Sequence, residues 1–163
     1  MELERLIRDF LVRSRRDLRA QLEAKYGLDP DEIDEMLDRM IHRVYGPALS
    51  LAESLKHGRV ALFVEREGCS VCRDTTPELE RFLKDHPDFS CIKLEYSKPE
   101  GLIYHILHQE ESGRLPLVAL ISDGTVMMLE TGSARAFAEY ERAAKCEGVC
   151  EVRAPGKSDC HGV

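Results

Sequence analysis

The chain has 163 residues, of which 43% are hydrophobic and 33% are charged, and its formal net charge at pH 7 is −7. This length suits one domain with an appendage, and the composition is typical of a soluble globular protein. The acidic balance argues against nucleic-acid binding, because phosphates reward clustered positive charge, and no apolar run is long enough to span a membrane. Residues 1–5 lack the basic-then-apolar pattern of a secretory signal, so we expect a cytoplasmic protein.

Two amphipathic helices are predicted at the start of the chain. Apolar residues recur at spacings of three and four in residues 1–26, and Gly27 suits the position after a last helical turn. Asp29, Pro30 and Glu32 then supply a cap, a first helical residue and a capping box for a second helix. Together the two patterns predict an α-helical hairpin.

Gly46 and Pro47 are expected to end the second helix, so that residues 1–46 form an extension and a shorter helix follows over about 48–56. The hairpin must bury its apolar stripes on the following domain or on another copy of itself, which makes a homodimer through residues 1–45 an option. Its arginines are interpreted as a solvated face that pairs with the acidic second helix, the alternative being a site that holds a partner or an anionic surface. They are Arg13, Arg15, Arg16 and Arg19.

The rest of the chain alternates between strand and helix patterns. Five consecutive apolar residues, 60–64, suit a strand buried on both faces. This order of elements predicts an α/β fold, a small mixed sheet with a parallel half and an antiparallel hairpin, flanked by helices. The further predicted elements are a helix after Cys69, a strand over 89–96, a helix from Pro99, strands over 117–121 and 126–130 joined by a tight turn at Asp123-Gly124, and a helix from the cap Ser133 to about Lys145 with Phe137 and Tyr140 facing inward.

Cys69 and Cys72 stand between the first strand and the helix that follows it, in a Cys-Ser-Val-Cys sequence. A helix N-terminus favours a thiolate, and in C-x-x-C motifs the thiol pKa drops from about 8.5 to roughly 3.5–7.5. We therefore expect a redox pair that closes a disulfide, with Cys69 at the open end as the nucleophile and Cys72 as the resolving thiol. Half of a zinc site and chance spacing are the alternatives.

The module around this pair resembles the thioredoxin-like superfamily over residues 48–145, as an atypical member with an N-terminal helical extension. Pro77 lies five residues after Cys72, where the family has a proline in its active-site helix. Leu115-Pro116 precedes the second apolar strand, where the family has a cis proline packed beside the cysteines. The remaining matches are the Asp123-Gly124 turn and Gly132.

This resemblance implies a thioredoxin-like fold and thiol:disulfide oxidoreductase activity through Cys69 and Cys72. It also implies that Leu115 and Pro116 line the substrate groove, and that no bound cofactor is required. The implied partners are a disulfide-containing protein substrate and a reductase that supplies electrons. The direction of exchange depends on the reduction potential, and a cytoplasmic location favours reduction of protein disulfides.

The sequence also departs from thioredoxin proper. The residues between the cysteines are Ser-Val instead of Gly-Pro, Gly68 replaces an aromatic residue, and Phe63 stands at the position of a buried acid. Lys93 does match the family's lysine on the neighbouring strand. Without the acid we expect slower resolution by Cys72, or proton transfer to solvent or to Glu65. The glutathione signature of glutaredoxins is absent before the last helix, so the prediction stays at a thioredoxin-like oxidoreductase.

Other residues that can carry chemistry lie outside this pair. The tail has three cysteines and a histidine, for which incidental cysteines, a thiol relay to the Cys69–Cys72 disulfide, and metal binding are the open interpretations. His105 and His108, three apart on a predicted helix, are interpreted as surface residues rather than a metal site. Cys91 is expected to pack as a small buried hydrophobe. The tail residues are Cys146, Cys150, Cys160 and His161.

The predicted organisation is therefore a helical extension (1–46), a thioredoxin-like domain (47–145) and a cysteine-containing tail (146–163). The predicted function is reduction of protein disulfides. The rival is a non-catalytic thioredoxin-fold binding or adaptor protein that uses the N-terminal helices, and metal binding by the tail is a third option.

Overall fold

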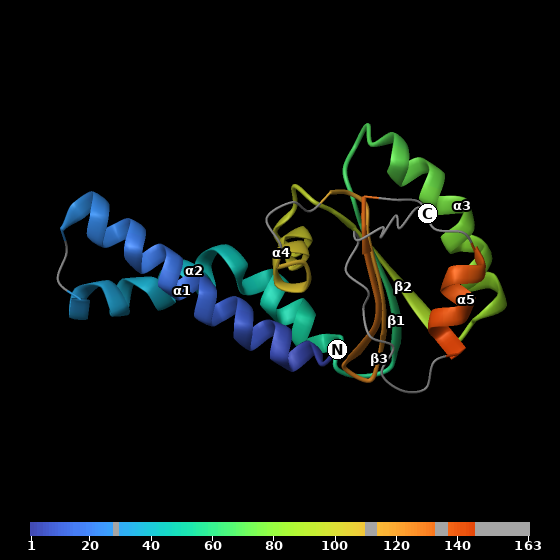
Figure 1. Cartoon of the computed structure of the whole chain (residues 1–163), viewed down its shortest axis with the longest axis horizontal. Helices are drawn as coiled ribbons and strands as arrows, with labels where there is room; N and C mark the ends of the chain where they lie inside the picture. Colours follow the sequence, from blue (N-terminus) through green and yellow to red (C-terminus); the bar gives the residue numbers. More distant parts are fainter. Residues whose placement is uncertain (28–29, 110–113, 133–136, 146–163) are drawn as a thin grey trace, which may run out of the picture.

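The computed structural model describes residues 1–27, 30–109, 114–132 and 137–145. Two long helices precede a region in which strands and helices alternate (Figure 1). In chain order the elements are α1 (Leu3–Tyr26), α2 (Pro30–Ser54), β1 (Arg59–Glu65), α3 (Ser70–Asp85), β2 (Phe89–Glu95), the 3₁₀ helix η1 (Pro99–Leu102), α4 (Ile103–Leu107), β3 (Leu117–Ser122), β4 (Thr125–Thr131) and α5 (Phe137–Lys145).

Some predictions concern residues outside this described part of the chain. They are the helix caps at Asp29 and Ser133, the inward-facing side chain of Phe137, and the roles of the tail residues Cys146, Cys150, Cys160 and His161.

The four strands form one mixed sheet in the order β2-β1-β3-β4. β1 pairs parallel to β2 and antiparallel to β3, and β4 returns antiparallel to β3. Asp123 and Gly124 connect β3 and β4 with positive φ angles, as the predicted tight turn requires. The predicted fold is confirmed: a thioredoxin-like mixed sheet flanked by helices and preceded by a helical hairpin.

Helices cover both faces of the sheet, which explains why β1 is a continuous apolar run. Leu62 and Val64 of β1 belong to a core that includes side chains of α1, α2 and α4. Ala61 and Phe63 point the other way, into a second core formed with α3 and α5 that contains Tyr140. Figure 1 shows α3 and α5 on one side of the sheet and α4 with the hairpin on the other.

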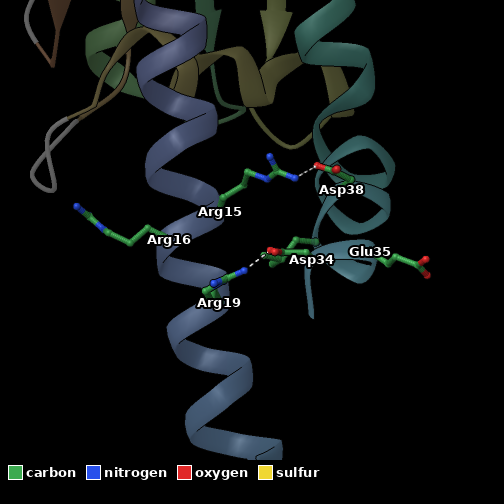
Figure 2. Close-up of a pocket in the computed structure, with 7 residues that line it drawn as sticks. Arg15, Arg16, Arg19, Asp34, Glu35 and Asp38 are labelled. Carbon is green, nitrogen blue, oxygen red and sulfur yellow. Dashed lines mark hydrogen bonds and ion pairs between the residues drawn. The ribbon is translucent and has the colours of Figure 1, made fainter. Parts of the chain in front are cut away.

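The hairpin of α1 and α2 extends away from the sheet, and charged side chains link its two helices (Figures 1 and 2). Arg15 donates a hydrogen bond to the Asp38 carboxylate at 2.6 Å, and Arg19 pairs with Asp34. The interpretation of the arginines as a solvated face that pairs with the acidic second helix is therefore confirmed for these two. Exposed pairs of this kind stabilise a fold by only about 0.2–1 kcal/mol each, so these ion pairs contribute little to the stability of the hairpin.

α2 runs from Pro30 to Ser54 without a break, so the predicted helix end at Gly46 and Pro47 is wrong. Pro47 has no N–H to donate to the carbonyl four residues earlier, which often ends a helix. Here Pro47 is exposed, so water can bind that carbonyl. The buried ridge of α2 also continues from Ile41 to Ala48, and burial of that ridge favours one helix over two.

The helix predicted from Pro99 is divided into η1 and the short α4. Gly101 of η1 lies directly against the backbone that leaves β2. A Cβ atom at this position would come within 2.3 Å of the Glu95 carbonyl oxygen and 2.8 Å of the Tyr96 Cα. Only glycine permits such an approach, and it places α4 over the sheet face that carries Leu62 and Val64.

Candidate active site

The cysteine pair follows directly from the end of the central strand β1. After Glu65 the chain makes a tight turn, in which the Cys69 N–H donates to the Arg66 carbonyl at 3.1 Å. Gly68 occupies the third position of this turn with φ of 78°, a left-handed conformation that suits glycine. The turn delivers Cys69 to the N-cap of α3, which begins at the next residue.

Cys69 and Cys72 form a disulfide across the first turn of α3, with their Cα atoms 5.3 Å apart. The Cys69 sulfur takes the role of a capping group, because it accepts a hydrogen bond from the Cys72 backbone N–H at 3.1 Å. A helix N-terminus presents unpaired N–H groups and the positive end of the helix dipole. These groups favour a thiolate on Cys69 whenever the disulfide is reduced.

The two sulfurs differ in their access to solvent. Cys69 is half-buried, whereas Cys72 is 1% exposed and packs in the core beneath α3. An incoming disulfide can therefore reach Cys69 and not Cys72. This asymmetry is what an attacking thiol and a resolving thiol require.

The structure adds neighbours to this pair that the sequence did not single out. A surface hollow of about 370 Å³ lies beside the disulfide, and Arg73 and Glu95 help to form its wall. Glu95 was detectable in principle, because β1 and β2 are parallel and their carboxyl ends meet at one edge of the sheet. The lining residues are Glu65, Arg66, Glu67, Gly68, Cys69, Cys72, Arg73 and Glu95.

Glu65, which lines this hollow, forms an ion pair with Lys93, with the Lys93 Nζ 3.0 Å from the Glu65 Oε1. Phe63, which replaces the acid of thioredoxin proper, is 2% exposed, and the Lys93 ammonium lies 5.5 Å from the centre of its ring. Phe63 and Glu65 are two residues apart on β1, so their side chains leave the same face of the strand. The carboxylate that pairs with Lys93 therefore lies two residues further along β1 than the acid of thioredoxin proper, on the same face of the strand and beside the hollow.

Leu115 and Pro116 lie where β3 begins. Their peptide bond is cis, Pro116 is buried and Leu115 is half-buried. Leu117 of β3 pairs with Val64 of β1. If this register continues by one residue, Pro116 lies opposite Glu65, at the edge of the sheet where the turn to Cys69 begins.

Leu115 packs against the same core as Cys69, although neither Leu115 nor Pro116 is among the described residues that line the hollow. No residue in the described part of the chain hydrogen-bonds the Leu115 backbone, whereas the Pro116 carbonyl accepts from the Gly132 N–H. The substrate-binding role of Leu115 and Pro116 stays a prediction.

Three residues outside the pair have surroundings that differ from those expected. Cys91 is free and exposed, so its predicted burial is wrong: it lies on β2, which is an edge strand of the sheet. His105 and His108 are both half-buried rather than on the open surface. The His105 Nε2 pairs with the Tyr96 hydroxyl at 3.0 Å, and the structure groups no three metal-ligating side chains within the residues it describes.

A mixed sheet in the order β2-β1-β3-β4, with a C-x-x-C disulfide at the start of the helix after β1 and a cis proline before β3, defines a thioredoxin-like fold. No family model matches the chain, and no curated protein matches it. Among the helices that the structure describes, none has the length and apolarity to cross a bilayer.

Solved thioredoxins are similar to this chain at low sequence identity. Mitochondrial thioredoxin 3 from Saccharomyces cerevisiae, in its oxidized form, is 18% identical over 59% of this chain and 87% of its own, with a TM-score of 0.48. Thioredoxin from Fasciola hepatica is 18% identical over 59% and 88% of the two chains, with a TM-score of 0.45. Plasmodium falciparum thioredoxin is 17% identical over 58% and 88%, with a TM-score of 0.45.

Proposed function

We propose that the protein is a thiol:disulfide oxidoreductase that reduces disulfides in other proteins through Cys69 and Cys72. The observation that carries this proposal is the asymmetry of the pair: one sulfur is accessible at the N-cap of α3 and accepts an N–H, and the other is buried one turn below it. Exchange at such a pair needs no bound cofactor, only an external dithiol donor.

In the proposed reaction the Cys69 thiolate attacks a substrate disulfide. A bond forms between Cys69 and one substrate sulfur, and the other substrate sulfur leaves as a thiolate that takes up a proton. Cys72, after losing its proton, attacks the Cys69 sulfur, re-forms the intramolecular disulfide and releases the second substrate thiol. Two electrons pass from the protein to the substrate, and a dithiol reductase returns them in the reverse exchange.

Two features of the site are assigned roles in this proposal. The backbone of Leu115, which no described residue hydrogen-bonds, is the place where an extended substrate segment would pair, beside Pro116. Glu65, which lines the hollow with Cys72 and is held by Lys93, would accept the proton of the resolving thiol in place of the missing acid at Phe63. A reducing compartment such as the cytoplasm fits the proposal.

The test is turnover of a protein disulfide, with insulin as the probe and the fully reduced chain as the enzyme. Cys69→Ser is expected to abolish insulin reduction. Cys72→Ser is expected to attack once and accumulate a mixed disulfide, because the resolving thiol is gone. Cys91→Ser is the matched control, since it removes an exposed thiol away from the pair, and it should leave turnover unchanged.

The same assay separates the proposal from a non-catalytic adaptor. A reduced wild-type chain that fails to reduce insulin, and fails to form a mixed disulfide as Cys72→Ser, contradicts an oxidoreductase and favours a binding protein that uses its N-terminal helices. With Cys72→Ser, a cell extract would also supply the natural partner as a disulfide-linked adduct, which identifies the substrate directly.

A further inference from the structure

The outer half of the hairpin has little core of its own. Near its tip the buried apolar residues form a separate small cluster of Leu22, Ile33 and Leu37, with Leu18 packed against it. The other half of α2 is buried in the main core through residues such as Ala48 and Ala52. Short amphipathic helices depend on burial of their apolar faces for stability, so the outer half is the part of the molecule with the most to gain from a partner.

An exposed apolar stripe runs along this outer half of α2. Met36, Met40 and Val44 follow one another at intervals of four residues, and they are 38%, 36% and 50% exposed. Pro47, also exposed, continues the same side of the helix. Exposed methionines on a helix face are adaptable contact residues, and Met is enriched in protein–protein interfaces.

This stripe lies on the side of α2 opposite the ion pairs. At 100° per residue, Met36 points about 160° away from both Asp34 and Asp38, and Met40 points about 120° away from Asp34 and about 160° away from Asp38. Figure 2 shows Asp34 and Asp38 directed toward α1 and Glu35 directed away from it. The apolar stripe is therefore not covered by α1, and the arginine face of the hairpin does not reach it.

The charges beside the stripe are divided between its two ends. Glu32 and Glu35 accompany the N-terminal end, and Arg39 and Arg43 accompany the C-terminal end. Arg39 pairs weakly with Glu35 on its own helix, at 3.8 Å. Glu32 and Arg43, by contrast, make no ion pair with any residue that the structure describes.

We propose that this face binds a second copy of the chain, with the two α2 helices antiparallel about a two-fold axis between Met36 and Met40. Met36 of each copy then packs on Met40 of the other. With a rise of 1.5 Å per residue, Glu32 lies about 9 Å from the axis and Arg43 about 7.5 Å from it on the other side, so each Glu32 meets the opposite Arg43. A parallel arrangement would instead place like charges together, which is unfavourable.

The shape of the molecule permits this arrangement. The outer half of the hairpin stands clear of the sheet in Figure 1, so the antiparallel partner places its own domain beyond the tip of the first hairpin. Four apolar side chains per copy make a contact smaller than the roughly 800 Å² per partner of a standard stable interface. We therefore expect a non-covalent dimer with a dissociation constant of about 1–100 μM.

The first experiment measures the mass of the full-length chain by sedimentation between about 1 and 200 μM, after alkylation of its free thiols. A concentration-dependent dimer is expected. Met40→Glu should make the chain monomeric throughout this range. Val12→Glu is the control, because Val12 is an equally apolar and more exposed residue, at 65%, on the α1 face that carries Arg15 and Arg19. It should dimerise like the wild type.

The second experiment tests the antiparallel register through charge. Glu32→Arg and Arg43→Glu should each weaken the dimer by about tenfold, because each replaces two symmetry-related ion pairs by like-charge contacts. The double variant Glu32→Arg/Arg43→Glu restores opposite charges and should regain wild-type affinity. Far-UV circular dichroism of every variant shows whether the hairpin is still helical.

Three results would overturn the proposal. The wild type is a monomer at every concentration, Met40→Glu dimerises as well as Val12→Glu does, or the double charge variant is no better than the single ones. A monomeric wild type that captures an unrelated protein through this face also counts against it. These outcomes are independent of the redox assay, since the disulfide lies on the thioredoxin-like domain and not on the hairpin.

Discussion

At Glu65 the central strand passes from the interior of the sheet to the hollow beside the disulfide. Among the acidic residues, Glu65 is the closest in sequence to Phe63, which stands where thioredoxin proper has a buried acid. Lys93 holds the Glu65 carboxylate in place by an ion pair. We expect Glu65→Gln to slow insulin reduction by about tenfold, less than the hundredfold or more typical of a general base, because water also reaches this half-exposed position. The Cys69-linked mixed disulfide should accumulate in that variant, since resolution and not attack is slowed.

Glu67→Gln is the matched control for Glu65→Gln, because Glu67 lines the same hollow without contacting Lys93. It removes a similar charge and should change the rate of mixed-disulfide resolution little. If both variants resolve the mixed disulfide at the wild-type rate, the proton of Cys72 goes to solvent, and Glu65 only orients Lys93.

At the scale of single residues, the chemistry of the site was predictable and its surroundings were not. Cys69 and Cys72 stood out because two residues between thiols, just before a helix, have a local physical meaning. Lys93 was identified only through the resemblance, and Glu95 reaches the site through the parallel pairing of β1 and β2, which the spacing of residues along the chain does not give by itself. The burial of Cys91 was predicted wrongly because alternation along a strand gives two faces but not which strand lies at the edge of the sheet.

Among the elements, α2 disagrees most with its sequence pattern. Gly46 and Pro47 are both unfavourable inside a helix, yet the helix continues through them. A Cβ atom at Gly46 would meet nothing within 4 Å. We therefore expect Gly46→Ala to raise the free energy of unfolding by about 0.5–1 kcal/mol, measured by urea denaturation.

Gly101→Ala is the contrasting change, since it adds the same methyl group at a position with no space for it. It should destabilise the fold by more than about 2 kcal/mol, because η1 must move away from the end of β2. A Gly101→Ala variant as stable as the wild type would contradict the close approach of η1, and a Gly46→Ala variant that loses stability would contradict the continuity of α2.

The strands were the elements predicted most accurately, since runs such as residues 60–64 leave no other option for a short apolar segment between turns. Helix ends were predicted less well. Tertiary burial decides whether a weak position such as Pro47 ends a helix, and local propensity carries no information about that burial.

For the whole molecule, the junction between hairpin and domain makes stability depend on pH. His105 lies on α4 and pairs with Tyr96, while Arg13 of α1 donates to the neighbouring Gln109 carbonyl at 2.7 Å. Burial, and then the electrostatic effect of the neighbouring His108 and Arg13 side chains, lower the pKa of His105 below its ordinary value of 6.5. The folded state therefore holds this proton less tightly than the unfolded chain does.

The sign of the pH dependence follows from that difference. Between the lowered pKa and 6.5 the unfolded chain binds more protons, so the contribution of His105 to stability is complete above pH 6.5 and is lost as the pH falls below it. We expect His105→Gln, which can still hydrogen-bond Tyr96 and does not titrate, to lose less stability than the wild type between about pH 7.5 and 5.5. Parallel urea midpoints for the two proteins over this range would contradict the assignment.

The overall topology was predictable because the order of strands and helices leaves few ways to pair a short sheet, and the C-x-x-C pair and Leu115-Pro116 then pointed to one of them. The position of the hairpin was not predictable. Its apolar stripes fit a neighbouring domain or a second chain equally well, and only the structure places Leu3, Leu6 and Phe10 in the core under the sheet.

That placement has a practical consequence for anyone who wishes to prepare the redox half alone. Leu3, Leu6 and Phe10 close the sheet face that carries Leu62 and Val64. A shortened chain that starts at residue 47 would expose this face to solvent as a large hydrophobic surface, and such surfaces cause aggregation. The N-terminal extension therefore completes the hydrophobic core of the redox domain. Its removal would abolish the activity although both cysteines remain in place.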